Sequence, residues 1–478
     1  MRRKTSVMNN RKAVSGEILL ALSILAVWIY GAVSGSLMRY DCRVLPGFGV
    51  TVTQYVLTAA TLLLCSREKK LHWDFSSIFL LSAAGLLGLS FTVYADNMLG
   101  LLNFPLLCAF TAQAIFAVTG QNETDSLSGK GVWEGFRRFF ISLFRQVPVP
   151  FRYVGRALLH EKHKGLGLGL IIAVPVVVVV LLLLSSADAV FGGFLTGFGD
   201  LFGKTDLLWE FILRIGFGLL LFSLLFSALC TPKELRQPKP VDPPPTVFAV
   251  VLAALTVIYA VFGYVQIRYF LLEGDSALIA NYSEYARTGF FQMIFVAAIT
   301  VAVELPALTL GKTGKAVRVL CAVVSLLTLL IDVSAFLRLR LYIQAYGLSM
   351  LRVMSLWAIL MVAALLIILL IKCAKPEIAL SKVVTAALLA GWIVFNFSNP
   401  NYRIAAYNVN AYNEKTLAVL DTDYLCGELT PDVRPALEQI KDEETREMAL
   451  DLLDMMYETR PNWYYYSLSW RHLPKNTP

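Results

Sequence analysis

Along this chain, runs of about twenty apolar residues alternate with shorter segments rich in charged and turn-forming residues. A helix of this length crosses the roughly 30 Å hydrocarbon core of a bilayer. We predict about eleven such spans, near residues 17–38, 46–66, 74–95, 98–119, 166–185, 207–230, 247–271, 290–310, 316–337, 351–372 and 378–397. Helices are expected rather than barrel strands, because hydrocarbon offers no partner for open backbone groups. The pattern therefore predicts an all-α, polytopic membrane protein, with the first run retained as an anchor.

Composition excludes an ordinary soluble protein. Of the 478 residues, 57% are hydrophobic and only 16% are charged, and the mean hydropathy is +0.63. A typical soluble domain carries about a quarter charged residues. The formal net charge is +8. Its basic residues lie in the loops between the spans, so we attribute them to membrane topology and to contact with anionic lipid rather than to nucleic-acid binding.

The positions of lysine and arginine orient the spans, because short loops rich in these residues stay on the cytoplasmic side. Basic residues cluster in the N-terminal segment, around residues 67–70 and throughout the loop 121–165. Alternate loops carry acidic residues such as Asp188 and Glu273. With an odd number of spans, the expected topology in the plasma membrane is a cytoplasmic N-terminus and an extracytoplasmic C-terminus.

Four parts are expected along the chain. They are a first transmembrane half (1–230) that includes the basic inner loop 121–165, a proline-rich linker (231–246), a second transmembrane half (247–397) and a small soluble helical module (398–478). The clustered prolines of the linker favour an extended, semi-rigid spacer. The module is a candidate site for a protein partner.

Within the module, local signals predict two short helices. Thr430-Pro431 is typical of a helix start, with proline in the first turn. The spacing of Met448, Leu452 and Met455 predicts an apolar helix face. Cys42 and Cys426 share the predicted outer side, so a disulfide between them is one possibility beside two free thiols.

The segment 132–147 has the pattern of an amphipathic helix. Aromatic residues recur on one side, and arginines gather towards the other, at Arg137, Arg138 and Arg145. Such a helix suits the headgroup region, with its apolar face down and its arginines on anionic lipid phosphates. A helix packed against the inner ends of the spans fits the same residues equally well.

Few ionisable residues fall inside the predicted spans, and each is a candidate functional group because a charge at mid-bilayer is costly. Glu304 and Asp332 lie on consecutive spans, where two carboxylates could share a proton or a cation; separate burial against hydroxyls or arginines is the alternative. Glu210 and Arg214 are four residues apart on one helical face, which favours a structural ion pair.

A polar group is predicted at the outer ends of the spans. It comprises Arg338, Arg340, Tyr342, Tyr346 and Arg352, with Tyr285 and Arg287 from the preceding outer loop. Arginine forks and tyrosine hydroxyls could together hold a phosphate or carboxylate. The alternative is that these side chains only anchor helix ends to lipid headgroups.

Three stretches of the chain are distinctive: YSEYARTGFFQ at 282–292, RLRLYIQAYGLSMLR at 338–352, and NPNYRIAAYN at 399–408 with LDTDYL at 420–425. They resemble bacterial membrane families described as domains of unknown function 4153 and 4173. The resemblance covers roughly residues 240–430 and implies a multi-pass bacterial membrane protein. It carries over no catalytic residue, because these families have no assigned activity.

Motifs of soluble enzymes are missing from the sequence. There is no Walker motif, G-x-S-x-G elbow or paired C-x-x-C, and His160-Glu-Lys-His163 has the wrong spacing for a zinc protease, so neither a metal nor a cofactor is expected. The sequence favours handling or transport of an ion, a small anionic solute or a lipid by the helix bundle. The alternatives are a membrane sensor or scaffold and, third, a transferase acting on a lipid-linked substrate.

Overall fold

The computed structural model describes residues 47–68, 71–94, 96–122, 124–149, 205–230, 245–267, 282–310, 314–457 and 466–473, together with Ser23. The predicted spans 17–38 (apart from Ser23) and 166–185 lie outside these residues. So do most of the linker 231–246 and the pair His160 and His163. All regular elements in the described residues are helical.

Ten helices precede the C-terminal module in the described part of the chain: α2 (Gly47–Glu68), α3 (Phe75–Val93), α4 (Asn97–Val118), α5 (Gly129–Arg145), α9 (Thr205–Cys230), α10 (Pro245–Ile267), α11 (Tyr282–Thr309), α12 (Lys315–Tyr346), α13 (Met350–Ala374) and α14 (Leu380–Phe397). Seven of them, namely α3, α4 and α10 to α14, are long and apolar enough to cross a membrane. The other two predicted spans among the described residues fall on α2 and α9, whose apolar stretches, Gly47–Leu63 and Arg214–Leu224, are shorter. The described residues therefore show an all-helical fold with seven candidate membrane spans, and the predicted count of eleven is not confirmed.

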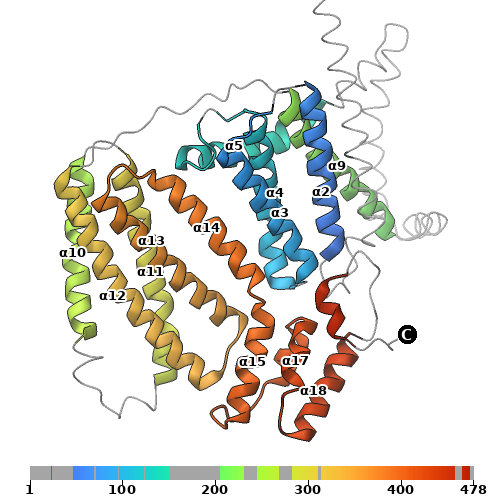
Figure 1. Ribbon diagram of the computed structural model, residues 1–478, viewed down its shortest axis with the longest axis vertical. Helices are drawn as coiled ribbons and strands as arrows, with labels where there is room; N and C mark the ends of the chain where they lie inside the picture. Colours follow the sequence, from blue (N-terminus) through green and yellow to red (C-terminus); the bar gives the residue numbers. More distant parts are fainter. Residues whose placement is uncertain are drawn as a thin grey trace, which may run out of the picture.

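The spans form two groups that stand side by side (Figure 1). Helices α10 to α13 make one group, α2 to α4 make the other, and α14 lies between them, in contact with α13 and α3. Asn103 on α4 donates to Asn396 on α14 at 2.6 Å, and Trp392 returns a hydrogen bond to Asn103 at 2.9 Å. The last span thus joins the two halves that the sequence separates.

The loops that connect the spans lie alternately at two opposite ends of the molecule. At one end, His72 N donates to Val118 O at 2.8 Å, and Lys382 Nζ lies 2.6 Å from Asp125 Oδ2. The loops that meet here are among those whose lysines and arginines predict the cytoplasmic side. We call this the basic end. The C-terminal module occupies the opposite end (Figure 1).

In the described part of the chain, the module has six short elements: α15 (Pro400–Asn413), α16 (Thr422–Gly427), η3 (Pro431–Val433), α17 (Arg434–Leu437), α18 (Glu443–Met456) and η5 (Leu468–His472). Thr430 is the N-cap of η3, with Pro431 in its first turn. On α18 the buried apolar residues are Ala449 and Leu453, whereas Met448 and Met455 are exposed. Leu452 of the predicted apolar face is partly buried against the module core, but the buried side of α18 is turned by one residue, to Ala449 and Leu453.

Cys426 is a free, buried thiol within the module. Its Sγ donates to Ala449 O at 3.3 Å, and burial raises its pKa to about 12. Cys42 lies outside the described residues. The Cys426 thiol therefore acts as a small packing group inside the module.

Candidate intramembrane polar site

Helix α12 buries several polar side chains, which is unusual for a membrane span. They are Ser325, Thr328, Asp332, Ser334 and Arg338. Ser325, Thr328 and Asp332 are spaced by three and four residues and share one side of the helix, its polar face. Ser334 and Arg338 lie on the other side, because a step of two residues turns the helix by about 200°. Both sides are buried because α12 lies against α10, α11 and α13. Burial of these residues thus follows from the central position of α12, not from its composition.

Two residues of α11 meet the polar face of α12 within the bundle. Ser325 Oγ donates to Glu304 Oε2 at 2.6 Å. Thr300 Oγ1 lies 3.1 Å from Thr328 Oγ1 and 3.2 Å from the hydroxyl of Tyr259 on α10. These contacts fix the antiparallel register of α11 and α12, and they place hydroxyl groups in succession along the interface.

Further along α12, Gln266 of α10 bonds two side chains. Its Oε1 accepts from Ser334 Oγ at 2.9 Å and from Arg338 Nη2 at 3.0 Å. We call the whole set the polar seam: Tyr259, Gln266, Thr300, Glu304, Ser325, Thr328, Asp332, Ser334 and Arg338. From Ser325 to Arg338 it follows α12 for about 20 Å at 1.5 Å per residue.

Glu304 and Asp332 are the two carboxyl groups of the seam. Glu304 is fully buried and Asp332 is 3% exposed. Glu304 Oε1 and Asp332 Oδ1 are each buried without a hydrogen-bond partner among the described residues. Since Asp332 lies seven residues beyond the Ser325 that binds Glu304, the carboxyl groups are about 10 Å apart along the helix axis. They share one interface at different levels and do not form a touching pair.

The predicted outer polar group does not converge on one point. Arg338 is buried on Gln266, whereas Arg340 is exposed on another side of α12. Arg352 donates to Tyr346 O at 2.8 Å and to Gly347 O at 2.6 Å, and its guanidinium lies 4.4 Å from the Tyr342 ring centroid. The structure therefore groups three of the predicted residues, Tyr342, Tyr346 and Arg352, around the end of α12.

The remaining sequence candidates fall at the edge of the described structure. Tyr285 and Arg287 lie on α11, but their side chains are outside the described part. The same holds for Glu210, while Arg214 is buried on α9. Among the described residues, no group of three or more His, Cys, Asp or Glu side chains could hold a metal ion.

The module clamps the turn that ends α12. Asn408 Oδ1 accepts from Leu348 N at 2.6 Å, and Asn408 Nδ2 donates to Leu348 O at 2.9 Å. The hydroxyl of Tyr424 accepts from Met350 N at 2.8 Å. Gly347 takes φ +74°, and a Cβ there would lie 2.6 Å from Asn408 Oδ1. We call Asn408 and Tyr424 the clamp. The close approach of Asn408 requires glycine at position 347.

A second polar cluster, which the sequence analysis missed, joins the module to α4. Asp96 caps α4 by accepting from Leu99 N at 2.7 Å, and it also accepts from Asn401 Nδ2 at 2.9 Å. Asp432 accepts from Thr430 Oγ1 at 2.9 Å and from Ser469 Oγ. Burial raises the pKa of Asp96. The sequence feature that pointed to this cluster was Asn401, which lies in the distinctive NPNYRIAAYN stretch.

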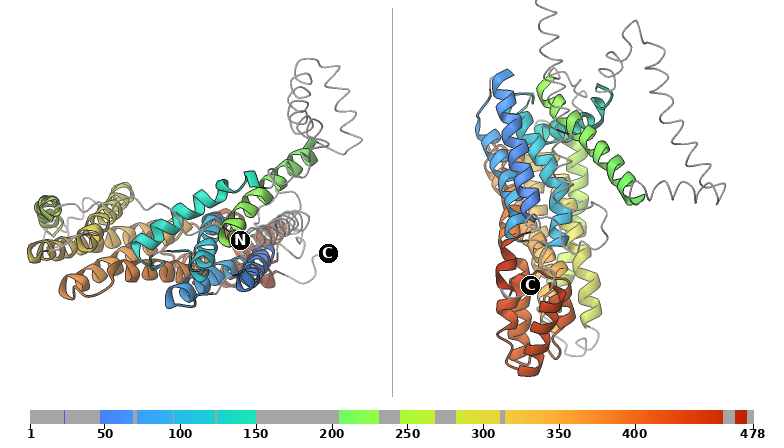
Figure 2. Two further views of the ribbon diagram at one scale, coloured as in Figure 1. Left: turned by 90° about the horizontal axis from the view of Figure 1, so that it is seen from above. Right: turned by 90° about the vertical axis from the view of Figure 1, so that its right-hand side faces the viewer.

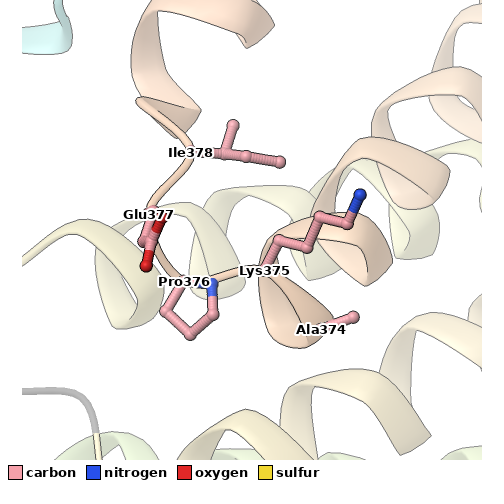
Figure 3. A pocket seen from close by; sticks show the side chains of 5 residues that line it. All are labelled: Ala374, Lys375, Pro376, Glu377 and Ile378. Carbon is pink, nitrogen blue, oxygen red and sulfur yellow. The ribbon is translucent and has the colours of Figure 1, made fainter.

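An open pocket lies at the α13–α14 turn, at the basic end (Figure 3). Its volume is about 430 Å³, and its lining is the five consecutive residues Ala374, Lys375, Pro376, Glu377 and Ile378. Lys372 Nζ donates to the carbonyl oxygens of Pro376 and Ile378 and so holds this turn. The pocket is a feature of the turn and is separate from the polar seam.

The comparison with protein families gives one match. Residues 81–440 match the family described as Domain of unknown function (DUF4153). The chain belongs to this family. The match begins within α3, so the family extends well before residue 240, where the sequence resemblance was expected to start. It covers the polar seam, the clamp and Asp96 together. Comparisons with curated proteins and with solved structures found no match.

Proposed function

We propose that this DUF4153 protein handles an ion within its helix bundle, and that the ion is a proton carried along the polar seam. The observation that supports this proposal is the pair of buried carboxyl groups, Glu304 and Asp332, each with an oxygen that has no partner in the described part of the chain. An ionisable side chain within a span costs about 2.5–3.5 kcal/mol on insertion scales, so its presence points to a function.

The side chains between and beside the carboxyl groups suit proton transfer. Ser325, Thr328 and Thr300 bear hydroxyls, and a hydroxyl both donates and accepts hydrogen bonds. In the proposed path, a proton moves between the carboxyl groups as these hydroxyls rotate and come into reach of one another. Two carboxyl groups in the same interface disfavour an anionic solute.

A second candidate function is sensing or scaffolding, and the clamp favours it. The module touches both halves of the protein, through Asp96 on one side and through Leu348 and Met350 on the other. A partner bound to the module would act directly on the end of α12. This role is compatible with ion handling, because α12 carries most of the seam.

The proposal places the protein in the plasma membrane with its basic end in the cytoplasm. The charge rule supports this orientation. Lys130, Arg145, Lys375 and Lys382 all belong to loops or helix ends at the basic end. The C-terminal module is then extracytoplasmic.

Purified full-length protein in liposomes that enclose a pH-sensitive dye tests the proposal. Under an imposed pH gradient, proton flux should exceed that of protein-free liposomes. Glu304→Gln and Asp332→Asn should abolish the excess, because each keeps the side-chain shape and removes the titratable group. Glu377→Gln and Asp451→Asn, at exposed positions, are the matched controls and should retain full flux. Wild-type flux in both seam variants, or no excess flux at all, would refute proton handling.

A further inference from the structure

Helix α5 has its polar face towards the protein and its apolar face outwards. Glu134, Arg138 and Ser142 are buried. Glu134 and Arg138 form an ion pair at 3.0 Å. The outward residues are large and apolar: Val132 at 41% exposure, Trp133 at 60%, Phe136 at 52%, Phe140 at 47%, Ile141 at 37% and Phe144 at 62%. A helix at a water-facing surface has the opposite arrangement.

Polar contacts hold α5 firmly in this orientation. Ser142 Oγ lies 2.7 Å from Ser227 Oγ on α9, and Gln146 N donates to Ser223 Oγ at 2.9 Å. Gln113 Nε2 on α4 donates to Gly131 O at 3.1 Å. Rotation of α5 about its axis would break these bonds and bury the Glu134–Arg138 pair in lipid. The aromatic face therefore stays outward.

The contacts of α5 also fix its depth. Gln113 lies five residues before the end of α4, which is about 8 Å along the helix axis. Figures 1 and 2 show α5 crossing the span ends at the basic end of the molecule. An interfacial helix buries its apolar face about 5–10 Å into the boundary between headgroups and acyl chains. With the end of α4 taken as the membrane surface, the position of α5 matches that depth.

From these observations we infer that α5 is a lipid-binding surface, which inserts its aromatic face into the leaflet at the basic end and selects phospholipids with anionic headgroups. Lys130 and Arg145 are exposed at the two ends of α5 and supply the charge that recognises phosphate. Arg138 does not take part, because it is buried on Glu134; of the two alternatives left open by the sequence, this residue follows packing against the protein. The inference is independent of proton handling.

Depth is tested on the full-length protein in phosphatidylcholine liposomes. Phosphatidylcholine brominated near the carbonyl end of its chains quenches tryptophan fluorescence at that depth. The quenched signal should drop in Trp133→Phe relative to wild type. Trp392→Phe is the control and should change the quenching less, because Trp392 is partly covered by Trp357 and Phe395. Equal quenching in wild type and Trp133→Phe would show that protein covers this face and would overturn the inference.

Headgroup selectivity is tested by equilibrating the detergent-solubilised protein with equal amounts of phosphatidylglycerol and phosphatidylcholine and measuring bound lipid by mass spectrometry. Lys130→Gln and Arg145→Gln should each lower the enrichment of phosphatidylglycerol about fivefold, the equivalent of about 1 kcal/mol per surface cation. Lys441→Gln, at an exposed position on the module, should have no effect. Unchanged enrichment in both α5 variants would overturn the selectivity for anionic headgroups.

Discussion

At the scale of single residues, one hydroxyl group holds Glu304, a buried carboxyl group of the seam. Ser325 donates one short hydrogen bond to Glu304, which satisfies one oxygen, while the other has no partner in the described residues. A protonated carboxyl needs few partners, whereas a charged one needs several or a cation. The environment of Glu304 is therefore suited to a group that gains and loses a proton, and this is the basis of the proposed liposome experiment.

Asp96 gives a prediction for the pH dependence of stability. Burial raises its pKa above the ordinary value of 3.8, against the lowering effects of the Leu99 N–H and Asn401. The folded protein thus binds this proton more tightly than the unfolded chain, and the Asp96 carboxyl costs stability as the pH rises from about 3.8 through the folded pKa.

Asp96→Asn should remove that cost. The gain in thermal stability over wild type should grow as the pH rises through this window and then level off. The amide oxygen introduced by the substitution can still accept from Leu99 N. Asn401 Oδ1, which has no partner among the described residues, can accept from the new amide nitrogen after the Asn401 side chain flips. Thermal unfolding in detergent at a series of pH values measures the effect. A stability difference that does not change with pH would contradict the prediction.

At the scale of elements, α12 is long enough to connect the bilayer interior with the module. Its 32 residues span about 48 Å, whereas the hydrocarbon core is about 30 Å thick. The predicted span 316–337 covers the part that carries most of the seam. The extension to Tyr346 carries the residues that Arg352 stabilises, and it ends at the turn held by the clamp.

The clamp predicts a specific loss on substitution. Asn408→Ala should leave the part-buried Leu348 N–H without its partner, at a cost of about 1–3 kcal/mol. Thermal stability should fall, and hydrogen exchange should increase at the α12–α13 turn. Asn410→Ala, at an exposed position on the same helix, is the control and should leave both unchanged. Equal exchange at the turn in the two variants would show that the clamp contributes nothing.

At the scale of the whole molecule, the gathering of basic loops at one end predicts the orientation in the membrane. Reporter fusions after residue 165 and after residue 376 should both report the cytoplasm, and a fusion after residue 430 should report the opposite side. Lys and Arg near short loops determine such orientations, and the module lies opposite these loops (Figure 1). The same compartment for residues 376 and 430 would contradict the topology.

The sequence by itself determined the class of the protein and the positions of its helices. Nine of the predicted spans coincide with helices of the described residues, because hydrocarbon forces each span to satisfy its backbone hydrogen bonds locally. Local capping signals likewise predicted the start of η3 at Pro431. Each of these features depends on residues that are near one another in the chain, so the pattern along the chain is sufficient.

Only the tertiary structure decided which polar residues meet. Arg338 bonds Gln266 across 72 residues, and Asp96 bonds Asn401 across 305 residues; no local pattern encodes such pairs. The periodicity of α5 defined its two faces but not which one is buried. In water the apolar face must turn inward, whereas beside a bilayer it can turn to lipid, so only the packing of Glu134 and Arg138 against the spans determined its orientation.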